Sequence, residues 1–238
     1  MDIRVVSDGS SGAIQTLGDA VVEGGSMIAD GAALRQSGVG VLLHPTSLPA
    51  PFGIGDLGPS AHEWIDLLAD HGIGWWQFLP LGPPGIGDAP YQPISAFAGN
   101  PLLISPQQLI EDGLIDRREL RFTDELPDAV DYSAVTSFKR NLLERAWRIF
   151  ATGAAPRLRA EYDQFLNTSA AWLDDFALFI AIKESQGQRS WLDWSCGLRM
   201  RDASALAEAR TALADAIDRV CVEQFLFFRQ LARLREYA

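Results

Sequence analysis

Cysteine and histidine are scarce in this sequence. The chain has only Cys196, Cys221 and three histidines among its 238 residues. Neither cysteine has the spacing of a metal-ligand motif, and two cysteines do not make a disulfide framework. The histidines are too scattered to form a metal cluster. We therefore expect no metal site and no fold held together by disulfides.

Long apolar runs and excess positive charge are also missing. No run of 18 apolar residues is present, so the sequence predicts no membrane span. Residues 1–20 lack the basic start and apolar stretch of a secretory signal. The 31 acidic residues outnumber the 20 basic ones, giving a formal net charge of -11. Such a surface repels phosphate backbones and anionic lipid headgroups. We expect a cytoplasmic protein with a neutral ligand and with neither nucleic-acid nor membrane partners.

The first patterned segment predicts a βαβ unit. The apolar run 39–43, ended by His44 and a proline, is typical of a buried strand. Ser60, with Glu63 three residues later, has the spacing of a capping box that opens a helix, and Gly72 would end that helix. A second apolar run follows the glycine. Short connections of this kind make the two strands parallel neighbours in one sheet.

Helical patterns continue from residue 106 to the last residue. Because parallel sheets are normally built from several βα units, two parallel strands indicate the opening portion of a larger α/β protein. The sequence thus predicts four segments: a poorly ordered extension at 1–36, βαβ units with substrate loops at 37–105, a helical insertion at 106–200, and a long helix at 201–238 that leads toward a third strand.

The stretch GDAPYQPISAFAGNP, residues 87–101, has the periodicity of neither a helix nor a strand. A loop that follows a parallel strand lies on the face where α/β barrels place their ligands. There Tyr91, stiffened by flanking prolines, would offer a flat apolar face to a neutral sugar, with Gln92 and Asn100 as hydrogen-bonding amides. Residue types alone favour a plainer alternative, in which Tyr91 and Phe97 only pin the loop to the core.

Four segments resemble the 4-alpha-glucanotransferases of glycoside hydrolase family 77, also called amylomaltases or disproportionating enzymes. They are GVLLHPTSLPAPFGIGDLG, WWQFLPLGPPGIGDAPYQPISAFAGNPLLI and, more weakly, WLDDFALFIAIK and EQFLFFRQ. The resemblance covers residues 38–238 and implies a (β/α)8 TIM barrel with a large helical insertion, of which this chain would hold the first two strands. The implied fold class is therefore α/β, an incomplete barrel.

The same resemblance implies an activity on α-1,4-glucans and maltooligosaccharides, in bacterial glycogen or maltose metabolism. Family members transfer a glucan segment to the 4-hydroxyl of an acceptor sugar with retention of configuration. That double displacement uses a carboxylate nucleophile and a carboxyl acid/base about 5 Å apart. It needs no cofactor and no metal.

The resemblance also implies which residues bind substrate. The tyrosine of the family's GDxPYQ loop falls on Tyr91, and the predicted substrate-binding set is Tyr91, Asp88, Gln92, Pro90, Ser95 and Asn100. Ala89 stands where many members have a serine, so one polar contact is lost. Ile86 and Thr136 replace tyrosines that form a second glucan site in some members. We expect that second site to be missing or different.

The family's catalytic acids do not carry over to this sequence. Its Arg-x-Asp-His, Glu-Asp-Leu-Gly and Thr-x-His segments are all absent. Asp70 and His71 echo the first segment, but they close a predicted helix. We therefore expect no catalytic residue before Ala238 and no activity from this chain alone. Three alternatives stay open: a non-catalytic glucan-binding module, a fragment of an α-amylase-like hydrolase, and a structural remnant.

Other polar residues are candidates for either a functional or a structural role. Asp88 either orients a sugar hydroxyl or, as we favour, holds its own loop by accepting main-chain N–H bonds. For His44 we favour a structural role in the turn that follows the first strand. Gln77 could point into a barrel. Asp174 and Asp175 are neighbours on a helix, about 100° apart, so they do not converge as a catalytic pair.

Overall fold

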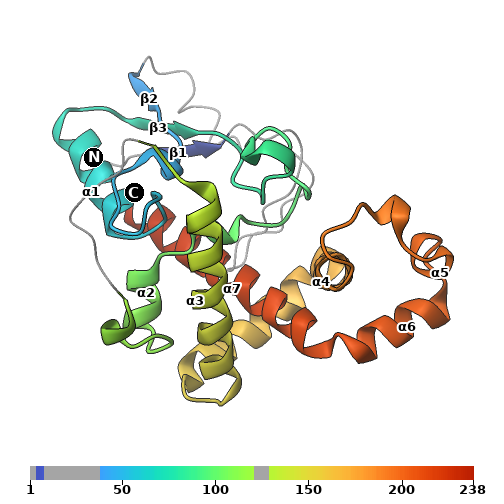
Figure 1. Cartoon of the computed structure of the whole chain (residues 1–238). Helices are drawn as coiled ribbons and strands as arrows, with labels where there is room; N and C mark the ends of the chain where they lie inside the picture. The colour runs from blue at the N-terminus through green and yellow to red at the C-terminus, as the bar shows by residue number, and fades with distance from the viewer. Residues whose placement is uncertain (1–3, 8–37, 121–128) are drawn as a thin grey trace.

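The computed structural model describes residues 4–7, 38–120 and 129–238 (Figure 1). Helices predominate over strands. The strands are β1 (Arg4–Ser7), β2 (Gly40–Leu42) and β3 (Trp75–Phe78). The helices are α1 (Pro59–Asp70), α2 (Pro106–Glu111), α3 (Tyr132–Ala151), α4 (Pro156–Ser185), α5 (Cys196–Arg199), α6 (Ala203–Ala212) and α7 (Ala214–Tyr237).

The strands form one parallel sheet in the order β1-β3-β2. Trp76 at its centre pairs with Val41 of β2 and with Val5 of β1. Because β2, α1 and β3 follow one another and the two strands are parallel, the predicted βαβ unit is confirmed. Within the described ranges the sheet has three strands and does not close into a barrel.

Strand β1 was not predicted. Arg4–Ser7 pairs with the free side of β3, whereas the sequence analysis assigned these residues to a poorly ordered extension. A four-residue strand is too short to give a recognisable alternation. The rest of that predicted extension, residues 8–36, lies outside the described residues.

The prediction of a buried first strand is wrong for one of its faces. Val39 is 67% exposed and Leu42 is 56% exposed, while Val41 is partly buried against the core. The core lies on the face of the sheet that carries Trp76 and Phe78. Val39 lies just before β2 on the same side as Val41, and Leu42 lies on the opposite face, so the described residues leave that face and the start of the strand uncovered.

Helix α1 begins differently from the prediction and ends as predicted. It starts at Pro59 with Gly58 as the N-cap and no side-chain cap, so the capping box at Ser60 is wrong. Proline suits the first helical position because its missing N–H would have no partner there. Gly72 follows the helix with a φ of 68°, the left-handed conformation expected of a residue that stops a helix.

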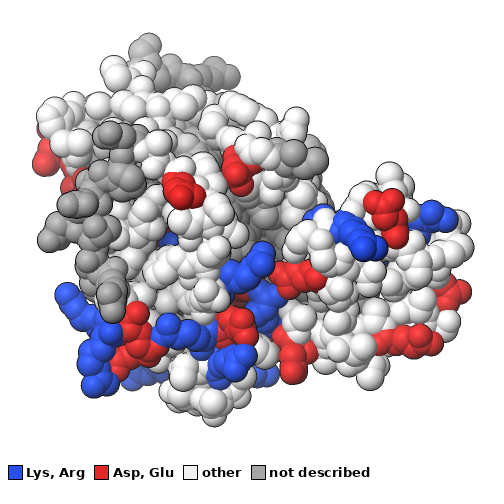
Figure 2. Space-filling model, in the orientation of Figure 1, with Lys and Arg blue, Asp and Glu red and all other residues white. Residues whose placement is uncertain are grey.

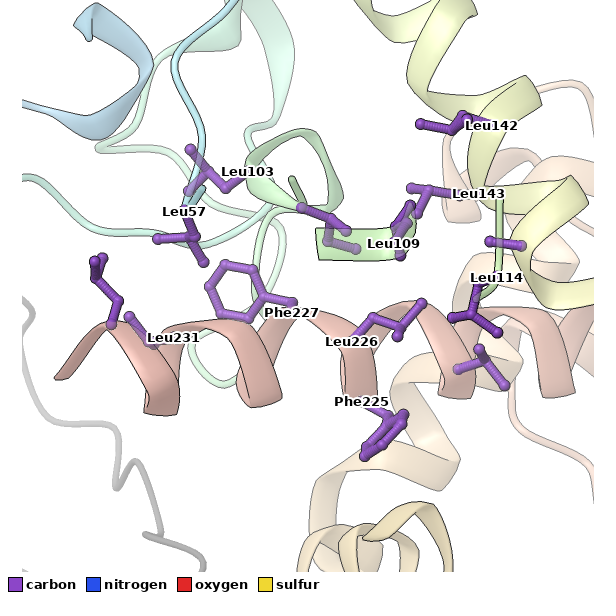
Figure 3. Close-up of a cluster of buried hydrophobic side chains, with 14 of the residues drawn as sticks. Leu57, Leu103, Leu109, Leu114, Leu142, Leu143, Phe225, Leu226, Phe227 and Leu231 are labelled. Carbon is purple, nitrogen blue, oxygen red and sulfur yellow. The ribbon is translucent and has the colours of Figure 1, made fainter. Parts of the chain in front are cut away.

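Helix α7 is the centre of the molecule. All eight residues from Val220 to Phe227 are buried, which is typical of a helix covered on every side. Helix α4 covers one side, where Phe165 contacts Phe225. On another side α7 meets leucines from four segments (Figure 3). These leucines are Leu57, Leu103, Leu109, Leu114, Leu142 and Leu143. The predicted long helix is divided at Leu213 into α6 and α7.

Helix α4 is also long and apolar enough to cross a membrane, by length and composition alone. Buried residues recur along it from Leu158 to Ile182 in contact with the rest of the described chain. A core helix of a globular protein passes the same test, so the finding is weak support for a span.

Candidate functional site

The loop 81–101 follows the carboxyl end of β3 and folds back on itself. Pro84 and Pro93 form an isolated antiparallel bridge. The N–H of Gly85 donates to the carbonyl of Gln92 at 2.9 Å, and a Cβ on Gly85 would lie 2.8 Å from that carbonyl oxygen. The two arms of the loop therefore approach each other as closely as glycine permits, which fixes the turn between them.

The turn between the arms exposes three of the predicted substrate-binding residues. Tyr91 is 68% exposed, and Asp88 and Gln92 are exposed beside it, with Pro90 partly buried. Asp88 has a φ of 54°. Its carboxylate makes no hydrogen bond to any described residue, which does not support our interpretation that Asp88 holds the loop. The turn thus presents a phenol, a carboxylate and an amide to solvent.

Ser95 and Asn100 shape the loop. The Ser95 hydroxyl accepts hydrogen bonds from the N–H groups of Phe97 and Ala98, both at 3.1 Å. Asn100 is buried and its Oδ1 accepts from the N–H of Leu102 at 3.0 Å. The structure gives these two predicted sugar ligands a role in fixing the backbone and does not bring them into the exposed turn.

The far end of the loop is fastened to α7. Gly99 exchanges two hydrogen bonds with the side chain of Gln224, and Ser105 does the same with Gln230. A Cβ on Gly99 would lie only 1.9 Å from the ring of Phe227. Sequence analysis missed this attachment. The available signal was two glutamines spaced six residues apart in an apolar helix, since buried amides need partners.

The two aromatic residues of the loop have different surroundings. Phe97 stacks on Trp172 of α4, with ring centroids 6.4 Å apart and planes 18° apart. Tyr91 has no ring contact with any described residue. The plainer alternative, in which both rings pin the loop, therefore holds for Phe97 and not for Tyr91.

His44 stands at the carboxyl end of β2. Its carbonyl accepts from the N–H of Ser47 at 2.9 Å, so the main chain makes the turn that follows. The Nδ1 atom is buried without a partner among the described residues. Burial lowers the pKa of His44 to about 4, so the ring is neutral near pH 7. The side chain does not anchor the turn as we expected.

The loop after β2 is fixed by a buried ion pair. Lys139 of α3 donates to Oδ2 of Asp56 at 3.1 Å, and both side chains are almost inaccessible. Oδ1 of Asp56 accepts from the N–H of Gly58 at 2.9 Å. Burial lowers the pKa of Lys139, and the charge of Asp56 opposes that shift. This pair links the loop after β2 to α3, and sequence reasoning did not find it.

Several carboxylates elsewhere in the described residues are paired with arginines, in places that include two on α4. Asp175 pairs with Arg201, in line with the predicted surface position. Glu184 and Glu223 both contact Arg219 between α4 and α7. Burial raises the pKa of Glu223, and Arg219 opposes that shift. Each of these three carboxylates is paired with an arginine. Neither place therefore offers a free carboxylate nucleophile beside a carboxylic acid.

Two further expectations concern metals and the second glucan site. No group of three or more His, Cys, Asp or Glu side chains in the described part of the chain could hold a metal ion. Thr136, one of the two replaced tyrosines, is partly buried in α3, and Ile86 begins the 3₁₀ turn Ile86–Asp88. Whether a second glucan site exists at these two positions stays a prediction.

Comparison with known proteins identifies the family. The model of the 4-alpha-glucanotransferase family matches residues 43–238. A 4-alpha-glucanotransferase of Thermus thermophilus is 43% identical over 199 residues, which are 84% of this chain and 39% of that protein. A chloroplastic or amyloplastic 4-alpha-glucanotransferase of Solanum tuberosum is 40% identical over 206 residues, 84% of this chain and 35% of the relative.

Solved structures agree with the sequence comparison. An amylomaltase from Streptococcus agalactiae, in complex with acarbose, superposes with a TM-score of 0.78 at 35% identity. The match covers 85% of this chain and 41% of that one. An amylomaltase from Corynebacterium glutamicum, at 18% identity and a TM-score of 0.52, shares the fold. This chain spans about two fifths of the length of the first of these relatives, and it belongs to the 4-alpha-glucanotransferase family.

Proposed function

We propose that this chain is the glucan-binding opening portion of a 4-alpha-glucanotransferase, acting on α-1,4-glucans in the cytoplasm. The observation that carries the proposal is Tyr91, exposed on a loop that is closed on itself and fastened to α7. A rigid, solvent-facing ring loses little entropy when a sugar stacks on it, so the loop is suited to a glucose unit. Asp88 and Gln92 beside it supply hydrogen-bonding partners for hydroxyl groups.

The position of the loop supports the same proposal. The loops after β2 and β3 leave the carboxyl ends of adjacent parallel strands, and in an α/β barrel those ends form the ligand-binding face. We propose that β2 and β3 are the first two strands of such a barrel. In the view of Figure 2, Lys and Arg side chains gather near α2 and α3.

Family membership defines the reaction that the whole enzyme would perform. A carboxylate attacks the anomeric carbon, the glycosidic C–O bond breaks, and an acid gives its proton to the departing 4-oxygen. The acceptor 4-hydroxyl then attacks the anomeric carbon of the glucosyl-enzyme, the bond from that carbon to the carboxylate breaks, and the acid/base residue takes the proton of the hydroxyl group. None of the three sequence segments that carry these acids in the family occurs in this chain. We propose that the chain binds glucan but does not transfer it.

Incubation with maltotriose tests the catalytic part. We expect maltotriose to stay unchanged, whereas glucose together with longer oligomers would contradict the proposed lack of transfer. Release of reducing ends without longer products would instead support the hydrolase alternative.

Calorimetric titration with maltoheptaose tests the binding part. Tyr91→Ala should weaken binding about tenfold, equal to about 1.4 kcal/mol, because the stacking face is lost. The matched control is Tyr132→Ala at the start of α3, which should leave binding unchanged. Equal affinities of wild type and Tyr91→Ala would contradict the proposed site, and no binding at all would favour the structural remnant.

A further inference from the structure

Strand β1 lies on the side of β3 opposite to β2 (Figure 1). It precedes β2 in the chain, yet its partner in the sheet is β3. All four residues of β3 have partners in β1, from Arg4 opposite Trp75 to Ser7 opposite Phe78, whereas β2 pairs with three of them. The side of β3 that faces away from β2 is therefore occupied along its whole length by Arg4–Ser7.

In a barrel, this side of β3 belongs to a different strand. The strands of a (β/α)8 barrel are parallel and lie next to one another in sequence order, so the strand after β3 would pair with β3 on the side away from β2. Strand β1 is parallel to β3 and holds that place. The two pairings would use the same main-chain groups of β3, so they exclude each other. This step rests on the proposed function, in which β2 and β3 are the first two strands of a barrel.

The sequences of the two strands explain why the edge needs a cover. Strand β3 reads Trp-Trp-Gln-Phe, which is rich in β-forming aromatic residues and carries no charge. An open apolar edge of this kind is a template for pairing with another chain. Strand β1 reads Arg-Val-Val-Ser, and natural sheets often end in short strands with charged residues because these discourage further pairing. Strand β1 thus replaces an edge that invites pairing with one that ends the sheet.

The directions of the main-chain groups show which atoms of β1 and β3 meet. The carbonyl of Gln77 accepts from the N–H of Leu43, so the main chain of Gln77 faces β2. Successive residues of a strand direct these groups to opposite sides, so those of its neighbour Trp76 face β1. Trp76 lies opposite Val5, and in a parallel pair an inward-facing residue bonds to the two residues that flank its partner. The N–H of Val6 therefore points at β3, and the N–H of Val5 points away from it.

We propose that β1 is a displaceable guard strand, which closes the sheet edge at which a barrel continues and whose release opens that edge to a strand of another chain. The βαβ unit does not depend on β1. Strand β3 keeps its pairing with β2 when β1 leaves, and the indole N–H of Trp76 donates to the carbonyl of Leu43 at 2.7 Å. A second copy of this chain can supply the strand that takes the opened edge.

Amide hydrogen exchange of the whole chain tests the pairing at the atoms concerned. Val6→Pro removes the N–H that faces β3, whereas Val5→Pro, the matched control, removes one that faces away, where a sheet edge tolerates proline. In Val6→Pro the amides of Trp76 and Phe78 should exchange about tenfold faster, and the amide of Gln77 should keep its protection. Equal exchange in the two variants would overturn the proposed pairing. Loss of protection at Gln77 as well would overturn the proposal, because β1 would then be an integral strand.

Sedimentation velocity tests the guarding role. Val6→Pro should associate at a concentration about tenfold lower than Val5→Pro, because its uncovered edge can pair with a second copy. Equal association of the two variants would overturn the guarding role. Neither measurement uses a sugar, so a failure of maltoheptaose binding would reject the proposed function without changing these results. A failure here would reject the guard strand and leave the glucan site at Tyr91 intact.

Discussion

The side-chain amide of Gln224 forms two hydrogen bonds with the main chain of Gly99, 125 residues away in sequence. The N–H of Gly99 donates to Oε1 at 2.7 Å, and Nε2 donates to the carbonyl of Gly99 at 3.0 Å. The pairing resembles one rung of a β-ladder, with a side chain in place of a second strand. It fastens the end of the Tyr91 loop to the most buried helix of the molecule.

Replacing this glutamine by an apolar residue should both destabilise the chain and loosen the loop. Gln224→Leu leaves a buried N–H and a buried carbonyl without partners, so the free energy of unfolding should fall by about 2 to 4 kcal/mol. Urea unfolding measures the loss, and hydrogen exchange should show faster exchange at the Gly99 amide. The control is Gln164→Leu on the exposed face of α4, which should change stability little. Unchanged exchange at Gly99 would contradict the fastening role.

Gly99 itself should not tolerate a methyl group. In Gly99→Ala the new Cβ would lie 1.9 Å from the Phe227 ring, so the loop or α7 has to move. Overpacking of this kind costs about 1 to 3 kcal/mol, and thermal unfolding measures it. Making room by shortening Phe227 is not a useful control, because Phe227 is a core residue and its replacement would itself destabilise the chain. The control is Gly74→Ala, because a Cβ at Gly74 meets nothing within 4 Å. Equal melting temperatures for the two variants would contradict the close approach.

The sequence could predict the local parts of this fold. Two apolar runs, a helical face between them and a stop at Gly72 are short-range signals, and the βαβ unit they define is confirmed. The start of α1 was misplaced because Ser60 has cap chemistry, whereas Pro59 and Gly58 decide the geometry. The exposure of Leu42 was missed because an apolar strand does not show which of its faces is covered.

The candidate site could be predicted only in part, for the same reason. Pro and Gly flanking Tyr91 indicate a stiff loop, and the structure shows one with the tyrosine exposed. The partners that hold the loop, Gln224 and Trp172, lie on helices remote in sequence. No spacing rule links them to the loop. Long-range pairs of this kind follow from the packing of α4 and α7, which a single sequence does not encode in any local pattern.

The buried pair Lys139–Asp56 should be more important for stability than any surface pair. In Lys139→Met the carboxylate of Asp56 stays buried without its partner, which costs about 3 to 5 kcal/mol. Chemical denaturation measures the loss. Arg148→Met is the control, because its pair with Glu144 is exposed to solvent and should contribute little. If the free energy of unfolding fell by similar amounts in the two variants, the buried pair would contribute no more to stability than the exposed pair. Because Asp56 also binds the Gly58 N–H, we expect the loop after β2 to lose protection from hydrogen exchange.

His44 should make the chain less stable in mild acid. Burial lowers its pKa from 6.5 to about 4, so the unfolded chain takes up a proton at a higher pH than the folded chain. The stabilising contribution of the neutral ring is therefore complete above pH 6.5 and is lost as the pH falls toward 4. For a ring still partly open to water, the loss is about 2 kcal/mol. Urea titrations across this range should show a steeper decline for wild type than for His44→Gln, since carboxylates titrate in both. Parallel curves would mean that His44 takes up its proton equally well in the folded and unfolded chains.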